Sequence, residues 1–333
     1  MKVAVLSPVA WRTPPRHYGP WEQMASNLTE GLVAAGLEVT LFATGDSITT
    51  AVLNSVVEKG YEEDRSQDAK VMECLHISNL MERAGEFDLI HNHFDFLPLS
   101  YSGLVKTPVI TTIHGFSSER IIPVYQKYNE HGHYVSISDA NRHPLLNYLG
   151  TVYNGLNSDE FEFRPQGGNY LLFFGRIHPD KGTAEAIEIA LQSKRKLIIA
   201  GIIQDENYFR EKVEPFLGDQ VEFIGSAGPE KRNELLGGAY ALLHPINFAE
   251  PFGLSVAEAM LCGTPVIAFN KGSMPELIND QKTGFLVSTT DEAINAVSAI
   301  DTINRKNCQE WALKKFSKEK MVEDYLALYH QII

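Results

Sequence analysis

The sequence alternates short apolar segments with amphipathic ones, and it does so twice, with one break in between. Apolar runs such as Val3-Ala4-Val5-Leu6 are typical of strands buried on both faces, and the segments that follow them carry apolar residues at helical spacing. This alternation predicts parallel sheets covered by helices on both faces, that is, an α/β fold. A length of 333 residues leaves room for two such sheets.

The expected elements fall into two halves. In the first half we expect strands at 2–6, 38–43, 89–91, 108–114, 134–138 and 151–153, and helices at 21–35 and 75–83. After a loop rich in turn residues between 156 and 168, the second half has expected strands at 170–175, 196–201, 221–225, 239–244 and 265–269. Its helices are expected at 183–192, 230–237 and 252–261. We therefore predict one domain at 1–157 and a second at 158–317, followed by a terminal amphipathic helix at 318–333 that packs on one of them.

Composition narrows the classes of partner. Lys and Arg number 29 and Asp and Glu 42, so the formal charge is 29 − 42 = −13. A surface this acidic repels nucleic acid, which we exclude as a partner, and a phosphate ligand would need a local cluster of cations and N–H groups. No apolar stretch approaches the ~20 residues of a membrane span, and Met1-Lys2 runs directly into the first strand without a leader. Three cysteines without paired spacing favour a reduced, cytoplasmic protein.

Ligands of open α/β sheets bind beyond the carboxyl ends of the strands, so the loops after the strands are the candidate sites. The loop after the first strand has Gly19 and Pro20 at the start of a helix, which is a natural place for an anion. It lacks the G-x-G-x-x-G pattern of dinucleotide sites, and a plain surface loop is the alternative. After strand 170–175, Arg176 and Lys181 could hold phosphate oxygens, or they could be solvated surface cations.

The third loop leads from Glu250 into the helix that contains Glu258. Pro251 keeps Glu250 on the turn, while Glu258 lies two turns into an otherwise apolar helix. A buried acid is costly unless it is paired, and sugar or ribose hydroxyls would pair with both glutamates. The alternative is that Glu258 caps a loop N–H group or pairs with a lysine. The first N–H groups of the helix, at Phe252, Gly253 and Leu254, are available to a ligand.

Histidines stand at several strand ends. His114 closes the strand at 108–114 and is either a polar contact in a cleft or a core residue. His91 and His93 share one face only if they lie in a strand, as do His131 and His133. Since no third ligand accompanies either pair, we expect no metal site. The segment from Ser138 to Arg142 also follows a strand and offers a hydroxyl and a cation.

These segments together resemble glycosyltransferase family 4. The resemblance is strongest from Glu250-Pro251-Phe252-Gly253-Leu254 to Gly284-Phe285-Leu286-Val287, where the two glutamates have the family's E-x7-E spacing. Phe174-Gly175-Arg176 with Asp180-Lys181-Gly182 is similar to the family's donor-phosphate loop. Thr112-Ile113-His114-Gly115 is similar to its histidine segment, and Tyr153-Asn154-Gly155-Leu156-Asn157 to its linker.

The resemblance implies a GT-B fold, in which two Rossmann-like doubly wound parallel sheets face each other across a cleft and the terminal helix crosses back onto the first domain. It implies that Arg176 and Lys181 neutralise the donor pyrophosphate, Glu258 binds the ribose, and Glu250 holds the transferred sugar beside the N–H groups of Phe252, Gly253 and Leu254. His114 would contact the sugar near its sixth carbon. Gly19 would lie under the phosphates, although Pro20 stands where the family often has a second glycine.

The implied activity is retaining transfer of a hexose from a nucleotide-diphosphate sugar to a saccharide hydroxyl, with GDP-mannose favoured over UDP-glucose. No cofactor is implied, and no divalent metal, since the sequence has no Asp-x-Asp triplet. Residues that could meet the acceptor are Arg16, His17, Tyr18, Trp21 and Arg142. A lipid acceptor or peripheral membrane contact stays open, although no basic amphipathic helix stands out. A nucleotide-sugar epimerase, a phosphorylase and a non-catalytic nucleotide-sugar-binding module are the alternatives on this fold.

Overall fold

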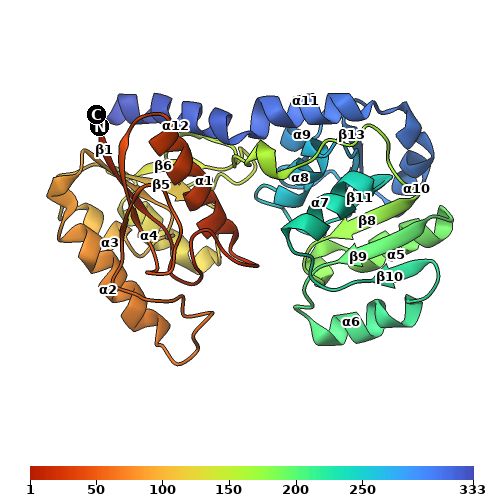
Figure 1. Ribbon diagram of the computed structural model, residues 1–333, viewed down its shortest axis with the longest axis horizontal. Helices are drawn as coiled ribbons and strands as arrows, with labels where there is room; N and C mark the ends of the chain where they lie inside the picture. The colour runs from red at the N-terminus through yellow and green to blue at the C-terminus, as the bar shows by residue number, and fades with distance from the viewer. The chain divides into compact units, whose positions relative to one another are not determined.

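The computed structural model describes residues 1–333, which divide into two compact units (Figure 1). The first unit comprises Met1–Leu156 and Lys318–Ile333, and the second comprises Asn157–Ser317. Each unit contains one parallel sheet with helices on both of its faces. The prediction of two α/β halves, each with its own parallel sheet, is therefore confirmed.

The first unit is built on a seven-stranded sheet in the order β3-β2-β1-β4-β5-β6-β7. Its strands are β1 Lys2–Leu6, β2 Glu38–Phe42, β3 Val52–Asn54, β4 Leu89–Asn92, β5 Val109–Ile113, β6 His133–Ser136 and β7 Tyr148–Thr151. Its helices are α1 Pro20–Ala34, α2 Ala69–Met81, α3 Leu99–Ser102, α4 Ile122–Lys127 and α12 Lys318–Ile332, with 3-10 turns η1 Ala84–Glu86 and η2 Glu119–Ile121.

The alternation of side chains along β1 explains why this sheet is covered on both faces. Val3 and Val5 belong to a core shared with α1 and α12, whereas Ala4 and Leu6 belong to a second core shared with α2. All four side chains have no exposed surface. Because successive strand residues point to opposite faces, a continuous apolar run is what a strand buried on both sides requires.

The C-terminal helix α12 packs against the first unit, beside α1 (Figure 1). Its buried face holds the apolar residues that the sequence places on one side, among them Met321, Leu328 and two tyrosines. The hydroxyl groups of Tyr325 and Tyr329 reach the sheet, at 2.7 Å from Thr112 Oγ1 and 2.6 Å from His91 Nδ1. These hydrogen bonds satisfy polar groups that would otherwise be buried without partners.

The second unit is built on a six-stranded parallel sheet in the order β10-β9-β8-β11-β12-β13. Its strands are β8 Tyr170–Phe174, β9 Lys196–Ala200, β10 Val221–Phe223, β11 Ala241–His244, β12 Val266–Phe269 and β13 Gly284–Val287. Its helices are α5 Thr183–Gln192, α6 Glu206–Lys212, α7 Pro229–Gly238, α8 Leu254–Leu261, α9 Met274–Leu277, α10 Thr290–Ala299 and α11 Arg305–Phe316. Single 3-10 turns complete it: η3 Ser158–Glu160, η4 Pro179–Lys181, η5 Glu214–Phe216 and η6 Ile300–Thr302.

Several boundaries differ from the predictions. The helix expected at 75–83 is α2, which begins at Ala69, where the Asp68 side chain accepts the N–H groups of Lys70 and Val71. The strand expected at 151–153 is β7, which lies three residues earlier. The sequence prediction omits edge strands β3 and β13 and helices α6, α10 and α11. Two of those helices have long polar faces, and the edge strands are short, so their apolar pattern is weak.

No helix of the structure combines the length and the apolar character that crossing a membrane would demand.

Candidate functional site

The order of the strands in the second sheet reverses between β8 and β11. From β8 the chain proceeds outward to β9 and β10, and from β11 it proceeds in the opposite direction to β12 and β13. A crevice opens at such a reversal, beyond the carboxyl ends of the two strands, and ligands of doubly wound sheets bind there. Arg176 and Lys181 follow β8, and Glu250 follows β11, so the topology brings the predicted phosphate and sugar residues to one place.

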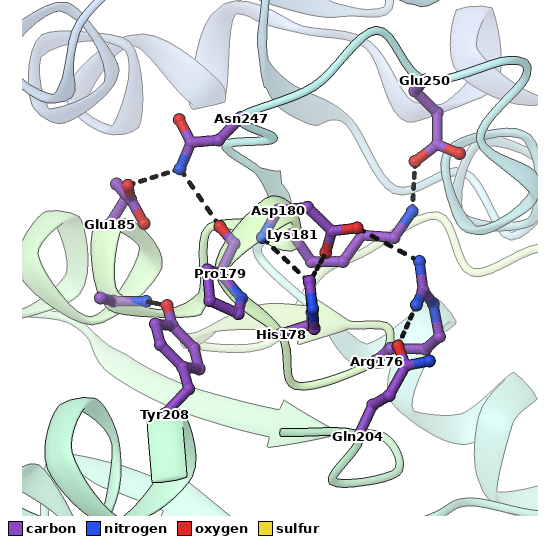
Figure 2. A network of polar contacts seen from close by, with 11 residues as sticks. Arg176, His178, Pro179, Asp180, Lys181, Glu185, Gln204, Tyr208, Asn247 and Glu250 are labelled. Atoms are coloured by element: carbon purple, nitrogen blue, oxygen red, sulfur yellow. Dashed lines mark hydrogen bonds and ion pairs between the residues drawn. The ribbon is translucent and has the colours of Figure 1, made fainter. Parts of the chain in front are cut away.

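Lys181 and Glu250 form an ion pair at this position (Figure 2). The side chain of Lys181 is 14% exposed and that of Glu250 is 11% exposed, so water screens the pair poorly. The ammonium group of Lys181 also lies 4.6 Å from the ring centre of Phe248. Each of the two charges therefore has an oppositely charged partner within the protein.

The ionisation of Glu250 follows from these neighbours. Burial by itself would raise the pKa of Glu250, but the proximity of His244 and the positive charge of Lys181 outweigh it and lower the pKa to about 2. His244 Nε2 lies 3.7 Å from Glu250 Oε2, beyond hydrogen-bond length, so Lys181 is the stronger partner. Burial lowers the pKa of His244, which leaves Lys181 as the positive charge of the group.

Arg176 is positioned by a different pair of residues. Its guanidinium group donates to Gln204 Oε1 and lies 3.4 Å from Asp180 Oδ2 (Figure 2). Asp180 also lies 2.7 Å from His178 Nδ1, which links the arginine to the turn that carries Lys181. Side-chain exposure of Arg176 is 27%, about twice that of Lys181. The two predicted phosphate cations thus project from one turn, with the arginine more open to solvent.

Backbone contacts tie the two loops of the site together. Asn247 donates its backbone N–H to Asp180 O at 2.7 Å and its side chain to Glu185 at 2.6 Å (Figure 2). On the other side of the loop, Gly272 packs on the backbone of Glu250. A Cβ atom at position 272 would lie 2.3 Å from Glu250 N, so only glycine allows this approach. Ser273 then donates its N–H to Glu250 O at 3.0 Å.

The helix that carries Glu258 begins two residues later than predicted. Gly253 has φ 91°, a left-handed conformation, so α8 begins at Leu254 and not at Phe252. The prediction is wrong at Phe252 because the turn requires a residue with positive φ immediately before the helix. The backbone N–H groups of Gly253 and Leu254 make no hydrogen bond within the protein. They point away from the first turn and remain available to an anion.

Glu258 lies on the buried side of α8, and its side chain is 10% exposed. Arg232 Nη1 of α7 lies 3.2 Å from Glu258 Oε1. Glu258 thus has a cationic partner within the protein, as in the alternative, although that partner is an arginine and not a lysine. Burial raises the pKa of Glu258, the charge of Arg232 lowers it in part, and Glu160 nearby adds to the increase.

In the first unit, three histidines gather at the ends of β4 and β5. His93 Nδ1 lies 2.9 Å from His114 Nε2, and the rings of His91 and His93 stack with centres 4.3 Å apart. His91 lies in β4 and His93 directly follows it, and their stacked rings lie on one side, as the spacing predicts. Burial lowers the pKa of His91 and of His114 to about 3 and that of His93 well below its usual 6.5, so all three are neutral. No group of three His, Cys, Asp or Glu side chains has the arrangement of a metal site.

Trp21 is the predicted acceptor-side residue that the structure brings to His114. The two rings stack with centres 5.7 Å apart and planes 21° from parallel. His114 itself is 8% exposed, so it is a buried residue directly after β5. Gly19 caps α1, which begins at Pro20, and the buried carboxyl group of Glu22 lies near it. Burial raises the pKa of Glu22 to about 7.

The other predicted acceptor-side residues lie apart from His114. Arg16 forms ion pairs with Asp46 at 3.0 Å and Glu63 at 2.6 Å. Arg142 hydrogen-bonds to Thr151 Oγ1 and stacks on Tyr148. His17 and Tyr18 are exposed. Arg16 thus pairs with carboxylates of two other loops and Arg142 with residues of β7, and among these residues Trp21 has the ring contact with His114.

Four site residues escaped the sequence reasoning: Gln204, Arg232, His244 and Gly272. His244 and Gly272 follow β11 and β12, so the rule that ligands bind at strand ends could have found them. Arg232 belongs to a helix far from both glutamates in sequence, and no local pattern distinguishes it from the neighbouring Lys231. Its place beside Glu258 comes from tertiary packing alone.

Known proteins resemble both units. Residues 157–319 match the family "Glycosyl transferases group 1". A D-inositol 3-phosphate glycosyltransferase from Streptomyces avermitilis is 24% identical, over 81% of this chain and 72% of that protein. AviGT4, a glycosyltransferase of avilamycin A biosynthesis, has a solved structure with TM-score 0.77, 24% identity and coverage of 100% of this chain and 98% of that one. HepE from Anabaena, solved with UDP and glucose, has TM-score 0.74, 19% identity and 98% coverage of each chain.

The solved structures confirm the predicted GT-B type of fold, with two Rossmann-like parallel sheets. The family match spans the second unit from its first residue, and it includes Arg176, Lys181, Glu250 and Glu258. The relative extends over most of both units. Residues 157–319 therefore match the glycosyl transferases group 1 family, the relative that extends over most of the chain is a glycosyltransferase, and the solved structures show the same fold.

Proposed function

We propose that this chain is a retaining glycosyltransferase, independent of divalent metal, that moves a hexose from a nucleotide-diphosphate sugar to a hydroxyl group of a saccharide acceptor. One observation carries the proposal: Arg176, Lys181 and Glu250 meet at the reversal point of the second sheet, within the segment that matches the glycosyltransferase family. Doubly wound sheets bind nucleotides at this point.

The two cations suit a pyrophosphate leaving group. As the bond between the sugar and the β-phosphate breaks, negative charge develops on the phosphate oxygens, and preorganised cations stabilise that charge most strongly in the transition state. Lys181 would exchange its contact with Glu250 for one with phosphate. Arg176 would donate two parallel hydrogen bonds from its guanidinium group to phosphate oxygens. The N–H groups of Gly253 and Leu254 at the start of α8 would add neutral donors.

The two acids suit the hydroxyl groups of the donor. With a pKa of about 2, Glu250 is a carboxylate at neutral pH and accepts hydrogen bonds from sugar hydroxyls. A carboxylate beside the ring also stabilises the positive charge of an oxocarbenium-like transition state. Glu258, in α8, would accept hydrogen bonds from the hydroxyl groups of the ribose.

We favour attack on the same face of the sugar that the nucleotide leaves. The bond from the anomeric carbon to the β-phosphate oxygen breaks, and a bond to the acceptor oxygen forms on that face. The acceptor proton passes to a phosphate oxygen, so the nucleoside diphosphate leaves with it and the configuration is retained. No carboxylate of the group is free of ion pairs to serve as a covalent nucleophile, since Glu250 pairs with Lys181 and Glu258 with Arg232.

His114 would contribute a neutral contact. Because burial keeps its ring uncharged, it can exchange hydrogen bonds with a sugar hydroxyl without placing a cation next to the developing positive charge. Trp21, stacked on that ring, offers an aromatic face of the kind on which sugars pack. These contacts support a saccharide as the acceptor or as the transferred group.

For the donor we propose GDP-mannose first and UDP-glucose as the second candidate. GDP-mannose follows from the sequence resemblance, and UDP-glucose from the likeness to HepE, which was solved with UDP and glucose. The acceptor class follows from the named relative, a D-inositol 3-phosphate glycosyltransferase, and from the aromatic residues near His114.

The test measures release of nucleoside diphosphate by the purified chain from GDP-mannose and from UDP-glucose, with a panel of small saccharides and inositol phosphates as acceptors. We expect release that depends on an acceptor, continues in EDTA, and yields a product with the anomeric configuration of the donor, read by NMR. Inversion, loss of activity in EDTA, or tight nucleotide binding without turnover would each contradict the corresponding part of the proposal.

A further inference from the structure

Arg232 connects three elements of the second unit. Its Nη1 atom lies 3.2 Å from Glu258 Oε1 on α8, and its Nη2 atom lies 3.2 Å from Glu160 Oε2 on η3. The centre of the guanidinium group lies 4.8 Å from the ring centre of Phe161. The arginine is thus held from three sides, in an orientation set by the protein itself.

The two acids that share Arg232 differ in exposure. The side chain of Glu258 is 10% exposed, whereas that of Glu160 is 44% exposed and can be hydrated. A buried carboxylate depends on its partner much more than a solvated one does. Arg232 therefore stabilises the ionised form of Glu258 more than that of Glu160.

From this arrangement we propose that Arg232 is a positioning residue of the donor site, which keeps Glu258 ionised and orients it to accept the ribose hydroxyls of the nucleotide. The proposal rests on the function proposed above, and it assigns to Arg232 a part that neither the sequence nor the relatives indicate.

The two carboxylate oxygens of Glu258 have different surroundings, which suits them to different contacts. Oε1 is occupied by Arg232, and Oε2 makes no hydrogen bond in the structure. An ionised carboxylate can only accept hydrogen bonds, and its oxygens have enough lone pairs to accept from two neighbouring ribose hydroxyls at once. Fixing one oxygen from behind leaves the other aimed in one direction, at no entropic cost when the nucleotide binds.

The charge of Arg232 matters because the other groups around Glu258 oppose its ionisation. Burial raises the pKa of Glu258, and the negative charge of Glu160 raises it further. Cys262, whose own pKa is raised by burial and by Glu258, supplies no positive charge. Arg232 is the group that acts in the opposite direction. Without it, Glu258 would take up a proton at a higher pH and would accept hydrogen bonds less well.

The experiment measures the dissociation constants of UDP and GDP by calorimetry at pH 6 and pH 8. The variants are R232Q, E258Q and the double variant R232Q/E258Q, with K231Q as the control. Lys231 directly precedes Arg232 on the same helix, is 53% exposed and pairs with Glu234. K231Q therefore removes one positive charge without changing the contact with Glu258. The ratio of each variant to the wild type at the same pH cancels the titration of the nucleotide phosphate.

We expect R232Q to weaken nucleotide binding by about tenfold at pH 6 and by less at pH 8, since loss of a charge-assisted contact has roughly this effect. E258Q should weaken binding equally at both pH values. The double variant should bind no more weakly than E258Q, because Arg232 acts through Glu258. K231Q should bind as the wild type does.

Two outcomes would overturn the inference while leaving the proposed function intact. In the first, R232Q binds like the wild type at both pH values although E258Q is impaired. In the second, the double variant binds more weakly than E258Q, which would mean that Arg232 contacts the nucleotide directly. The double variant leaves no buried charge unpaired, so it serves even if R232Q does not fold. If E258Q binds nucleotide as tightly as the wild type, the ribose assignment of the proposed function fails, and the inference fails with it.

Discussion

The carboxyl ends of the two sheets hold polar groups of opposite kinds. In the first unit, His91, His93 and His114 are buried, neutral and stacked on or hydrogen-bonded to one another. In the second unit, Lys181 pairs with Glu250 and Arg232 with Glu258, so the corresponding edge is built from full charges. Both sheets have the same type of fold, which therefore does not decide the chemistry at its strand ends.

The difference indicates which part of a ligand each unit suits. Full charges that are already paired can exchange partners with a charged ligand without leaving an ion unpaired, which favours a diphosphate. Neutral imidazoles and an indole ring suit uncharged hydroxyl groups and the apolar face of a sugar. The predictions below test this contrast, beginning with the largest expected effect.

The first prediction concerns acid stability, in which the two units should differ. In the first unit burial lowers the pKa of four histidines below the usual 6.5: to about 4 for His76, to about 3 for His91 and His114, and well below 6.5 for His93. The unfolded chain therefore binds these protons first. The stability that is present above about pH 6.5 is lost as the pH falls, at roughly 1.4 kcal/mol per pH unit for each proton.

Two buried carboxyls of the first unit act in the other direction. Burial raises the pKa of Glu22 to about 7 and that of Asp95 to about 6, so the folded state binds their protons first and gains stability as the pH falls. Because there are four such histidines and only two such carboxyls, the unfolding free energy of the first unit should fall, on balance, as the pH falls. In the second unit, His244 is the buried histidine with a lowered pKa, and Glu250, with its pKa of about 2, loses its contribution only below about pH 4.5.

Hydrogen exchange at pH 5 and pH 7.5, corrected for the intrinsic rate, checks this difference. We expect β4 and β5 to lose protection at pH 5 before β8 and β11 do. His91→Gln, which removes one titrating group, should reduce the pH slope of the unfolding free energy in the first unit. Equal loss of protection in both units would contradict the contrast between neutral and charged edges.

The second prediction concerns Lys181. Lys181→Ala removes a cation from the position of the leaving group and leaves Glu250 without its main partner, so turnover should fall by more than tenfold and by up to ~100-fold. Steady-state release of nucleoside diphosphate measures the effect. Lys196→Ala is the matched control, since Lys196 also pairs with a glutamate but is 43% exposed. A variant at Lys181 that turns over like this control would remove Lys181 from the site.

The third prediction concerns Arg176. Arg176→Ala should lower turnover by about tenfold, less than the change at Lys181, because Arg176 is more exposed and charges near water are better screened. The same assay measures it, with Arg195→Ala as the control, since Arg195 stacks on Tyr240 elsewhere in the unit. If both variants, at Arg176 and at Lys181, kept wild-type rates, the assignment of the phosphate position would be wrong.

The fourth and smallest effect is expected at Glu258. Glu258→Ala should raise the KM for the donor severalfold with little change in kcat, because contacts with the ribose are present both before and during the reaction. Varying the donor concentration at saturating acceptor separates the two constants. Unchanged values of both would exclude Glu258 from the donor site and would weaken the contrast between the units.

The sequence predicts the elements at the centre of both sheets and misses one edge strand of each sheet, β3 and β13. Strands β1, β8 and β11 are continuous apolar runs because helices cover both of their faces, and such runs are easily recognised. Strand β3 is three residues long and partly exposed, and α11 is polar over most of its surface. Their positions depend on contacts with distant parts of the chain, which leave little trace in a local pattern.

The same distinction holds for the candidate site. Glu250, Glu258, Arg176 and Lys181 stand out in sequence because charged residues follow apolar strands or interrupt an apolar helix. Arg232 does not stand out, since it lies among other charged residues on a helix whose sequence is typical of a solvent-exposed surface. Likewise, nothing local indicates that Arg16 would pair with acids of two other loops, or that Arg142 would bond to the hydroxyl group of Thr151 in β7.

The amino-acid sequence by itself determined the two parallel sheets and the loops that carry the charges, because burial on two faces and strand-end chemistry are written in local patterns. Only the tertiary structure decided the pairing of those charges, Lys181 with Glu250 and Arg232 with Glu258. It also decided the contacts among His91, His93 and His114 and the stacking of Trp21 on His114. The physical reason is that an ion pair or a stacked ring joins residues far apart in the chain, and their separation depends on how helices and sheets pack.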